Sequence, residues 1–285
     1  MRRACVLFPL LFAAASVCPA AQRALLIDGA SNDGRDWNQQ SGPVKAILES
    51  LGPFQVDVET ADAHSQPVFE KYKLIVLNYG GNAWTIATLA ALDKYVTNGG
   101  GIVALPGADS AFPDSPSYNL MLGVAAAANR DQHAGPLWFY KNGNVSYDDT
   151  TPGKAGSMIR PGEPFLVTIR DTEHPITKGL PLSWLHVSDE LAGRVRGPGK
   201  NMVLLVTAFS DPAKGGTGLN EPQMVAVTYG KGRIFHTLLG RTAEAWQGVG
   251  LRTLLARGAQ WAATGKVTLK PPADFPTEEK VTKGP

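Results

Sequence analysis

Three short segments of the sequence gather side chains that could bind hydroxyl groups or transfer protons. In the first, the turn 28–37, the oxygens of Asp28, Asn32 and Asp36 come beside the indole of Trp37. Carboxylates and amides bond to hydroxyl groups, and an indole offers an apolar face to a sugar ring. The turn therefore favours a site for a hydroxyl-rich ligand. The alternative is that Asp36 caps the following helix while Trp37 packs in the core.

A second candidate, Asp109, follows a glycine-rich stretch and a short apolar run. A glycine after a strand can mark the sharp turn that presents a nucleophile in hydrolase-like sheets. Here the apex is Pro106-Gly107, which carries no nucleophile, so Asp109 is interpreted as an acid–base residue and Phe112 as a ligand contact. The glycines 99–101 themselves are better explained as a turn that ends a helix.

The third segment contains His186, Asp189 and Glu190. Residues three apart share a face of a helical turn, so His186 and Asp189 could form an acid–base or metal-ligand pair. A structural hydrogen-bonding role is the alternative. His174 is interpreted as a turn residue, and His236, which lies in a strand pattern, as a core residue.

The small number of cysteines and histidines limits the kinds of catalytic and metal site that the protein can form. The two cysteines, Cys5 and Cys18, both precede residue 21, so the rest of the chain has no disulfide, no cysteine-ligated zinc and no cysteine nucleophile. We expect no cofactor and no tightly held transition metal, because imidazole and thiolate ligands are scarce. A divalent metal bound by carboxylates stays open as an alternative.

The start of the chain has the order of a secretory signal peptide. Arg2 and Arg3 precede an apolar run, Val6 to Ala15, and small residues continue to Ala21. This order predicts that residues 1–21 are a leader cleaved near Ala20 or Ala21, and that the mature protein is periplasmic or secreted. An uncleaved anchor and a buried first helix are the alternatives. No later apolar run reaches the ~20 residues of a membrane span.

The charge balance excludes one class of partner. Removing Arg2 and Arg3 from the 27 basic residues leaves 25, which equals the 25 acidic residues. Nucleic-acid binders usually carry a basic excess, so we expect no nucleic-acid partner. A small carbohydrate is the expected ligand. The sequence is compatible with both a monomer and a homo-oligomer.

These candidates must be positioned by strands that alternate with helices in the first half of the chain. Helical spacing of apolar residues predicts helices before Gly52-Pro53 and over 86–96, and this alternation favours a mostly parallel, flavodoxin-like sheet flanked by helices. Ligands bind at the carboxyl ends of such strands, which adds Asn78 and Tyr79 to the candidate contacts. The strands expected here cover residues 23–29, 54–58, 74–78 and 102–105.

Antiparallel additions are expected in the second half. A hairpin is predicted over 136–147 with its turn at Asn142-Gly143, and another around Gly230-Lys231-Gly232. Residues 22–264 are predicted to form one α/β domain that ends with a helix over 249–262. Four prolines after Gly265 predict that 265–285 is an extended tail.

Taken in order, these motifs resemble the trehalose-utilisation (ThuA-like) family over about residues 23–276. The resemblance implies a fold similar to class I glutamine amidotransferases and a link to carbohydrate metabolism. The absence of cysteine after the leader is incompatible with amidotransferase chemistry. The motifs that carry the resemblance include Leu-Leu-Ile-Asp-Gly from Leu25, Tyr72 to Tyr79, Ala108-Asp109-Ser-Ala-Phe112, His174 to Pro181, Trp184-Leu-His186 with Asp189-Glu190-Leu191, and Tyr229 to Thr237.

The chain departs from the family pattern at four places. Related sequences often carry histidine where this chain has Arg35, Pro106, Met158 and Arg241. The family's histidine site is therefore expected to be lost. Arg241 would then act as a fixed positive charge at the ligand.

Three functions follow from these residues. The first is an exported hydrolase or isomerase acting on a sugar or oxidised sugar, with Asp109, His186 and Asp189 or Glu190 as its catalytic groups. The second is a sugar-binding or accessory protein without catalysis. The third is a partner-binding module that uses the proline-rich tail.

Overall fold

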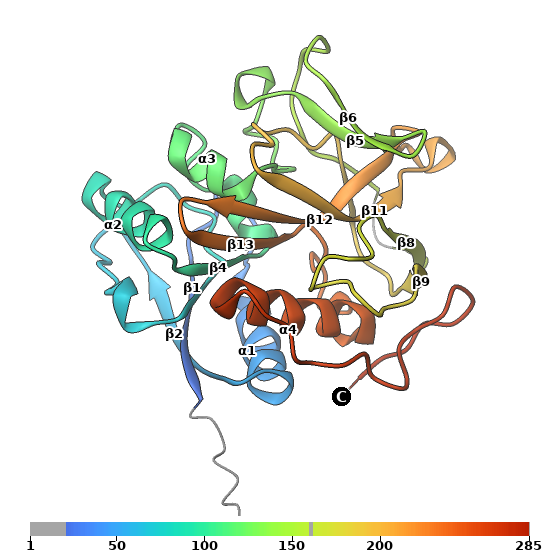
Figure 1. Ribbon diagram of the computed structural model, residues 1–285. Helices are drawn as coiled ribbons and strands as arrows, with labels where there is room; N and C mark the ends of the chain where they lie inside the picture. The colour runs from blue at the N-terminus through green and yellow to red at the C-terminus, as the bar shows by residue number, and fades with distance from the viewer. Residues whose placement is uncertain (1–20, 160–161, 285) are drawn as a thin grey trace, which may run out of the picture.

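A single large sheet with helices on both faces forms the molecule (Figure 1). The computed structural model describes residues 21–159 and 162–284, and of residues 157–159 only the backbone. The predicted leader, residues 1–21, lies outside this range except for Ala21.

Five strands form the parallel half of the sheet, in the spatial order β2-β1-β3-β4-β13. Strands β3 and β4 are buried along their whole length, because helices cover both of their faces. The predicted strands of the first half are confirmed. The five are β1 (Gln22–Gly29), β2 (Phe54–Ala61), β3 (Leu74–Leu77), β4 (Gly101–Ala104) and β13 (Gly232–Thr237).

The other strands of the sheet are antiparallel and continue from β13 in the order β12-β11-β8-β9. A hairpin of β5 and β6 joins β12, and β7 pairs with β10 in a separate small sheet. These strands are β5 (Leu137–Lys141), β6 (Asn144–Asp148), β7 (Ser157–Ile159), β8 (Phe165–Ile169), β9 (Ser183–His186), β10 (Leu191–Gly193), β11 (Met202–Phe209) and β12 (Asn220–Tyr229).

The prediction of a mostly parallel sheet is therefore wrong. In the described main sheet, four neighbouring pairs are parallel and six are antiparallel. The physical reason is the length of the connections. No long helix separates the strands between β5 and β13, and short connections join antiparallel strands only. A buried antiparallel strand such as β12 also has the continuous apolar pattern of a parallel one.

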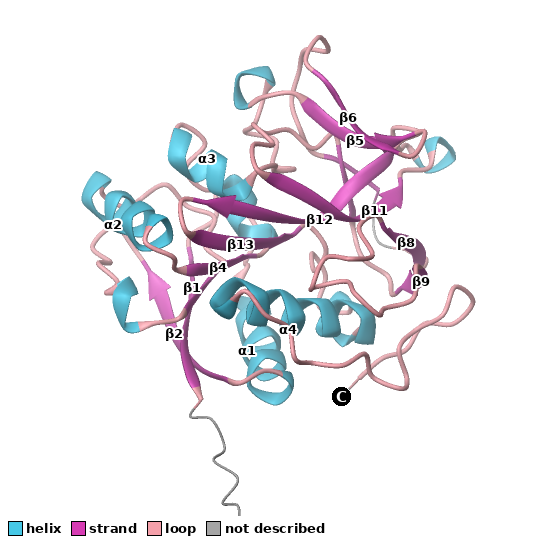
Figure 2. Cartoon of the chain, in the orientation of Figure 1, coloured by secondary structure: helices cyan, strands magenta, loops and turns pink. Residues whose placement is uncertain are grey.

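Helices cover the two faces of the sheet (Figure 2). On one face α1 and α4 pack together over β1, β2, β4 and β13; on the other, α2 and α3 cover β12 and β13. Each face has its own apolar core, the first around Trp184 and Trp246 and the second around Phe69 and Tyr79. The α-helices are α1 (Asn38–Leu51), α2 (Ile86–Thr97), α3 (Pro116–Leu122) and α4 (Val249–Thr264). Short 3-10 turns are η1 (Phe69–Lys71), η2 (Pro106–Ser110), η3 (Gln132–Ala134), η4 (Pro212–Lys214) and η5 (Ala245–Gln247).

One edge of the sheet collects most of the candidate residues. Strands β1, β3, β4 and β13 end there because they are parallel. Since β12 is antiparallel to β13, and β11, β8 and β9 alternate in turn, β11 and β9 also end at this edge, while β12 and β8 begin there. We call it the carboxyl edge, and the opposite one the amino edge.

The residues after α4 form a strap along the surface rather than a free tail (Figure 1). The amide of Leu185 in β9 donates to the carbonyl of Thr277 (2.7 Å), and the amide of Val249 donates to that of Thr282 (2.9 Å). The ring of Phe275 meets Trp184 edge-on, with 5.3 Å between ring centroids. The strap therefore caps the start of α4 and extends along the last strand of the sheet.

Candidate functional site

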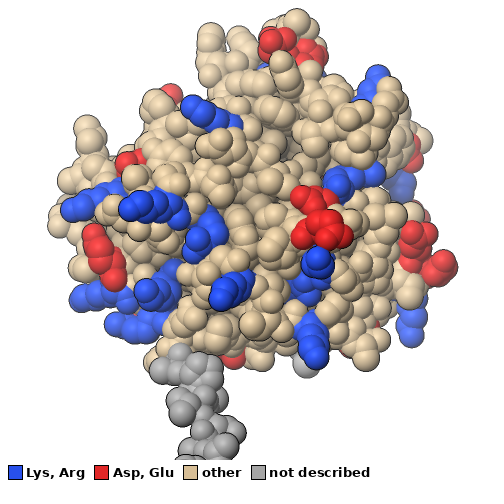
Figure 3. Space-filling model, in the orientation of Figure 1, with Lys and Arg blue, Asp and Glu red and all other residues tan. Residues whose placement is uncertain are grey.

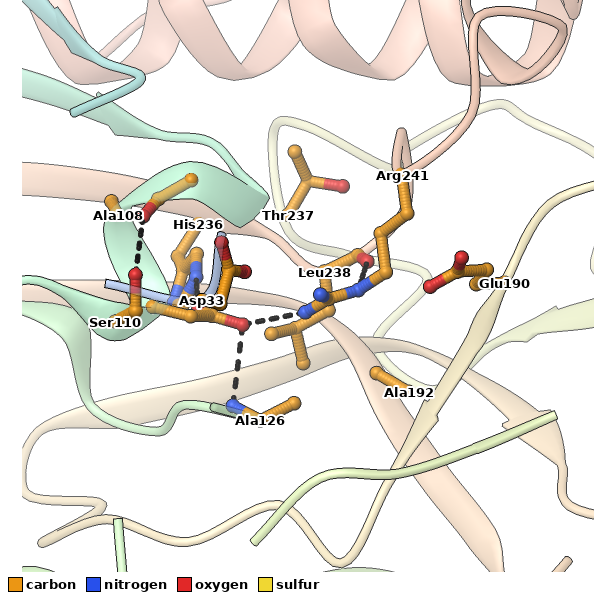
Figure 4. A network of polar contacts seen from close by, with 12 residues as sticks. Asp33, Ala108, Ser110, Ala126, Glu190, Ala192, His236, Thr237, Leu238 and Arg241 are labelled. Atoms are coloured by element: carbon orange, nitrogen blue, oxygen red, sulfur yellow. Dashed lines mark hydrogen bonds and ion pairs between the residues drawn. The ribbon is translucent and has the colours of Figure 1, made fainter. Parts of the chain in front are cut away.

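A buried charge network lies at the carboxyl edge, with Asp109 at its centre (Figure 4). Asp109 sits in η2, directly after β4, and its side chain is 2% exposed. One carboxylate oxygen faces Nε2 of His236 in β13 (2.9 Å). The other accepts from Nη2 of Arg241 (2.6 Å) and from the amide of Ala126 (3.2 Å). The carboxylate is thus surrounded by donors.

His236 bridges Asp109 and the end of α3 through its two ring nitrogens. Its Nδ1 lies 3.1 Å from the carbonyl oxygen of Leu122, which can only accept, so Nδ1 carries a proton. Its Nε2 lies 2.9 Å from the Asp109 carboxylate, so the ring is held between two acceptors. Burial acts to raise the pKa of Asp109, but the hydrogen bond and charge of His236, together with the charge of Arg241, outweigh burial and hold that pKa below its ordinary value.

A second buried carboxylate, Asp189, holds the loop that carries Arg241. Its Oδ2 accepts from the amide of Gly240 (2.7 Å) and lies 3.2 Å from Nε2 of His186. Its Oδ1 accepts from the amides of Arg241 (3.0 Å) and Thr242 (3.2 Å). Asp189 therefore fixes the Arg241 backbone while Asp109 fixes its guanidinium.

The predicted pairing of His186 with Asp189 is present, although the expected helical turn is not. His186 is the last residue of β9, and Asp189 lies in the loop that follows. The chain turns back at the carboxyl edge, which brings the two side chains together. Both are at most 1% exposed, so neither meets solvent in this conformation.

Partly exposed charged residues form a rim above this network. Nη2 of Arg35 lies 2.7 Å from Oε2 of Glu190, and the Arg35 guanidinium also lies 5.5 Å from the centre of the Trp37 ring. The indole nitrogen of Trp37 donates to Asp33 (3.2 Å). Figure 4 shows Asp33 and Glu190 on either side of the Arg241 guanidinium in that view. Asp33, Arg35 and Glu190 are therefore the charged groups that a ligand at this rim would meet first.

The remaining candidates of the first turn lie at the same edge but make internal contacts. Asp28 is buried and bonds to the hydroxyl of Ser41 (2.6 Å), and Trp37 is 1% exposed. Asp36 is exposed and accepts from the amide of Asn38 at the start of α1 (3.2 Å). The buried indole of Trp37 has no open face for a sugar ring.

The candidates after β3 and β4 also hold the loops of this edge together. The side-chain amide of Asn78 donates to the carbonyl of Trp37 (2.7 Å), and that of Asn32 donates to Ser110 (2.9 Å). Tyr79 and Phe112 are buried and stacked, with 5.7 Å between ring centroids. These residues brace the loops that carry the rim.

A groove of about 880 Å³ adjoins the network where Asp189 forms part of its wall. Phe165 and Phe209 supply aromatic surface, and Phe209 is 52% exposed. Glu163, Asp211 and Lys214 bring charged groups to the same groove, with 3.1 Å between Nζ of Lys214 and Oε2 of Glu163. Aromatic surface beside a few polar groups is typical of small-molecule sites.

The sequence patterns did not predict the contact of His236 with Asp109, the ion pair of Arg35 with Glu190, or this groove. His236 and Asp109 are 127 residues apart, so no local spacing connects them. Strand order would have predicted this contact. Strands β4 and β13 are parallel neighbours, and the two side chains lie at or just beyond their ends. Among the described residues, no group of three His, Cys, Asp or Glu side chains is arranged to hold a metal ion.

The comparisons with known proteins agree with this architecture. The family model described as "Trehalose utilisation" (ThuA) matches residues 23–262. This chain belongs to the ThuA family. A putative ThuA-like protein from Parabacteroides merdae is 38% identical with a TM-score of 0.86, over 92% of this chain and 97% of that one. Membership of the family points to a carbohydrate-related role.

More distant structures share the fold alone. A putative ThuA-like protein from Bacteroides uniformis is 18% identical (TM-score 0.58) over 92% of this chain and 97% of its own. A β-galactosidase from Rahnella sp. R3 is 15% identical (TM-score 0.51), over 92% of this chain and 33% of the enzyme. No curated protein matches the sequence. As for membrane insertion, none of the helices in the described residues has the length and apolar character to cross a bilayer.

Of the four positions where ThuA relatives are expected to carry histidine, one lies in the network and one at the rim. Arg241 is the partner of Asp109, and Arg35 is the partner of Glu190. Pro106 begins η2, and the side chain of Met158 lies outside the described atoms. This ThuA member thus places arginines, which stay charged at every physiological pH, where its relatives are expected to carry titrating imidazoles.

Proposed function

We propose that this ThuA-family protein binds a small carbohydrate in the groove beside Asp189. The observation that carries the proposal is the exposed ring of Phe209 within reach of charged groups in one groove at the carboxyl edge. An aromatic face suits the C–H side of a sugar ring, while Asp211 and Lys214 suit its hydroxyl groups. The carbohydrate-related role of the family supports the choice of ligand.

Titration calorimetry against a panel of mono- and disaccharides tests the proposal. The wild-type protein is expected to bind at least one of these sugars. The variant Phe209→Ala is expected to weaken that binding by about tenfold or more, because it removes the apolar platform. Tyr147→Ala is the matched control, since Tyr147 is 59% exposed on the β5–β6 hairpin and outside the groove. Absence of heat with every sugar would contradict the proposal.

A hydrolase or isomerase acting on the bound sugar is the second candidate, and Glu190 is the residue that favours it. Asp109 and Asp189 are buried and surrounded by donors, and His186 is buried. Glu190 keeps a partly exposed carboxylate, 17% accessible, at the rim. It is therefore the group best placed among the predicted catalytic residues to exchange a proton with a ligand.

The variant Glu190→Gln separates catalysis from binding. If Glu190 transfers a proton, the variant loses turnover by at least about a hundredfold, measured as product released from the sugar that calorimetry identifies. Sugar affinity should change little, because the amide keeps the shape of the side chain. The variant Glu278→Gln, an exposed acid on the strap, is the control. Turnover that is equal in wild type and Glu190→Gln would exclude Glu190 as the proton-transfer group, and absence of turnover in the wild type would leave binding as the function.

Export completes the proposed function. The order of basic, apolar and small residues in 1–21 supports a cleaved leader, and the described domain begins its first strand at Gln22, directly after the expected cleavage site. The protein would then meet its carbohydrate in the periplasm or outside the cell.

A further inference from the structure

Exposed lysines gather at the amino edge, opposite the candidate site. They come from separate elements that all reach this edge: η1 and the start of β3, the last turn of α2, the β12–β13 turn, and the residues just after α4. Figure 3 shows Lys and Arg atoms concentrated on the side of the molecule where α2 and β2 lie. We define the amino-edge surface as Lys71, Lys73, Lys94, Lys231 and Lys266.

None of these lysines forms an ion pair among the described residues. Within residues 21–159 and 162–284, no carboxylate lies within 4.0 Å of any of the five ammonium groups. Arg23, at the same edge, is by contrast paired with Asp57 at 2.6 Å. Two acids, Glu70 and Asp93, adjoin Lys71 and Lys94 in sequence, and Asp93 accepts from the hydroxyl of Tyr229, so the five lysines leave a local excess of positive charge.

The amino-edge surface is broad rather than concave. Strands β1 and β13 are three neighbours apart, which corresponds to about 14 Å at the usual strand spacing of ~4.8 Å. The lysines stand along this width on different elements and do not converge on one point. A lysine carries a compact charge on a flexible stem and lacks the planar fork that recognises a single phosphate group. The arrangement suits an extended anionic surface.

The course of the chain indicates which anionic surface this is. Strand β1 starts at the amino edge, so the residues before Gln22 join the domain there. In sequence, those residues are basic and then apolar, the order of a leader that enters a membrane during export. The amino edge is thus the part of the domain nearest to lipid while the leader is attached.

We propose that the amino-edge surface binds the surface of a bilayer that contains anionic lipids. Docked in this way, the protein turns its carboxyl edge, with the rim and the groove, toward the aqueous side. Each lysine near an anionic bilayer strengthens binding by about fivefold, which corresponds to ~1 kcal/mol. The proposal is independent of the sugar that the groove accepts.

Sedimentation with vesicles tests the proposal on the processed protein purified after export. It is expected to bind vesicles of phosphatidylglycerol and phosphatidylcholine in equal parts, to bind phosphatidylcholine alone much less, and to dissociate as salt is raised. The double variant Lys73→Gln/Lys231→Gln should weaken partitioning about 25-fold, fivefold for each charge. The matched control, Lys141→Gln/Lys154→Gln, removes two exposed lysines outside the amino-edge surface and should bind as wild type does.

Three outcomes would overturn the proposal. One is equal binding to both kinds of vesicle, and another is an equal loss in the two double variants. The third is binding to a soluble anionic polysaccharide such as dextran sulfate without binding to vesicles. Circular dichroism checks that both double variants fold, which is expected because all four lysines are exposed.

Discussion

Asp109 shows how one buried carboxylate can organise a site. It joins β4 to the loop after β13 through Arg241, and to β13 itself through His236. The guanidinium of Arg241 balances this carboxylate, and at the rim Arg35 is paired with Glu190. Arginine at positions 35 and 241 therefore gives the site a fixed pattern of ion pairs.

Replacing Asp109 with Asn is expected to destabilise the fold strongly. The neutral amide leaves the buried guanidinium of Arg241 without its counter-charge, and such losses cost about 3 to 5 kcal/mol. The free energy of unfolding, measured with urea at pH 7, should fall by that amount. Asp149→Asn, an exposed acid, is the control and should leave the urea midpoint unchanged. If the urea midpoint of Asp109→Asn equals that of wild type, the ion pair between Asp109 and Arg241 contributes nothing to stability.

The effect of Asp109→Asn depends on pH in a direction that its pKa determines. The folded state lowers this pKa, so the contribution of the carboxylate is complete above the unfolded-state pKa, near ~3.9, and is lost as pH falls through the folded pKa. The difference in the free energy of unfolding between wild type and variant should therefore be constant from pH 7 to about pH 5. It should disappear below about pH 4.

Local patterns predicted side-chain pairs only where the partners are close in sequence. His186 and Asp189 were paired correctly because three residues separate them, even though the intervening turn is not helical. The contact of Asp109 with His236 required knowledge of strand order, since β4 and β13 come from opposite ends of the domain. The prediction that His236 lies in a buried strand is confirmed, but a local pattern cannot predict that its partner is Asp109.

At the scale of elements, the length of the connections between strands determines how well strand order can be predicted from the sequence. Where strands alternate with helices, as in β3, α2 and β4, the spacing of apolar residues is clear, and the predicted bounds are nearly those of the structure. The second half was predicted as strands without their order, because short connections permit several antiparallel arrangements. The groove depends on that order, since Phe165 and Phe209 line it together only when β8 pairs with β11.

The strap is expected to stabilise the domain through Phe275. Its ring is partly buried against Trp184, and Phe275→Ala should lower the free energy of unfolding by about 2 kcal/mol. Hydrogen exchange should also accelerate at the amides of Leu185 and Val249, which donate to the strap. Lys283→Gln is the control, since it removes only the exposed ion pair with Glu244 and should cost less than about 1 kcal/mol. Unchanged exchange at both amides in Phe275→Ala would mean that the strap holds without this ring.

At the scale of the whole molecule, the two edges of the sheet have different roles. The carboxyl edge carries the network, the rim and the groove, while the amino edge receives the chain from the predicted leader. The proposed ligand site and the predicted leader are therefore separated by the length of the strands.

Leader removal is the prediction that belongs to this scale. The protein recovered from the periplasm or the medium should begin at Ala21 or Gln22, because small residues precede both positions. Intact mass and N-terminal sequencing measure this directly, and a chain that keeps Met1 would show that the leader is not processed. A variant with Arg2 and Arg3 changed to Glu should accumulate unprocessed, whereas the same change at Lys141 and Lys154 should not.

The strap also determines where foreign sequence can be attached to this protein. Gly284 donates to the carbonyl of Gln247 (2.8 Å), and Lys283 lies against the start of α4, so the last residues of the chain are integrated into the surface. A tag fused there would disturb these contacts with η5 and the start of α4. An affinity tag that replaces the leader, ahead of Gln22, would leave every contact of the carboxyl edge intact.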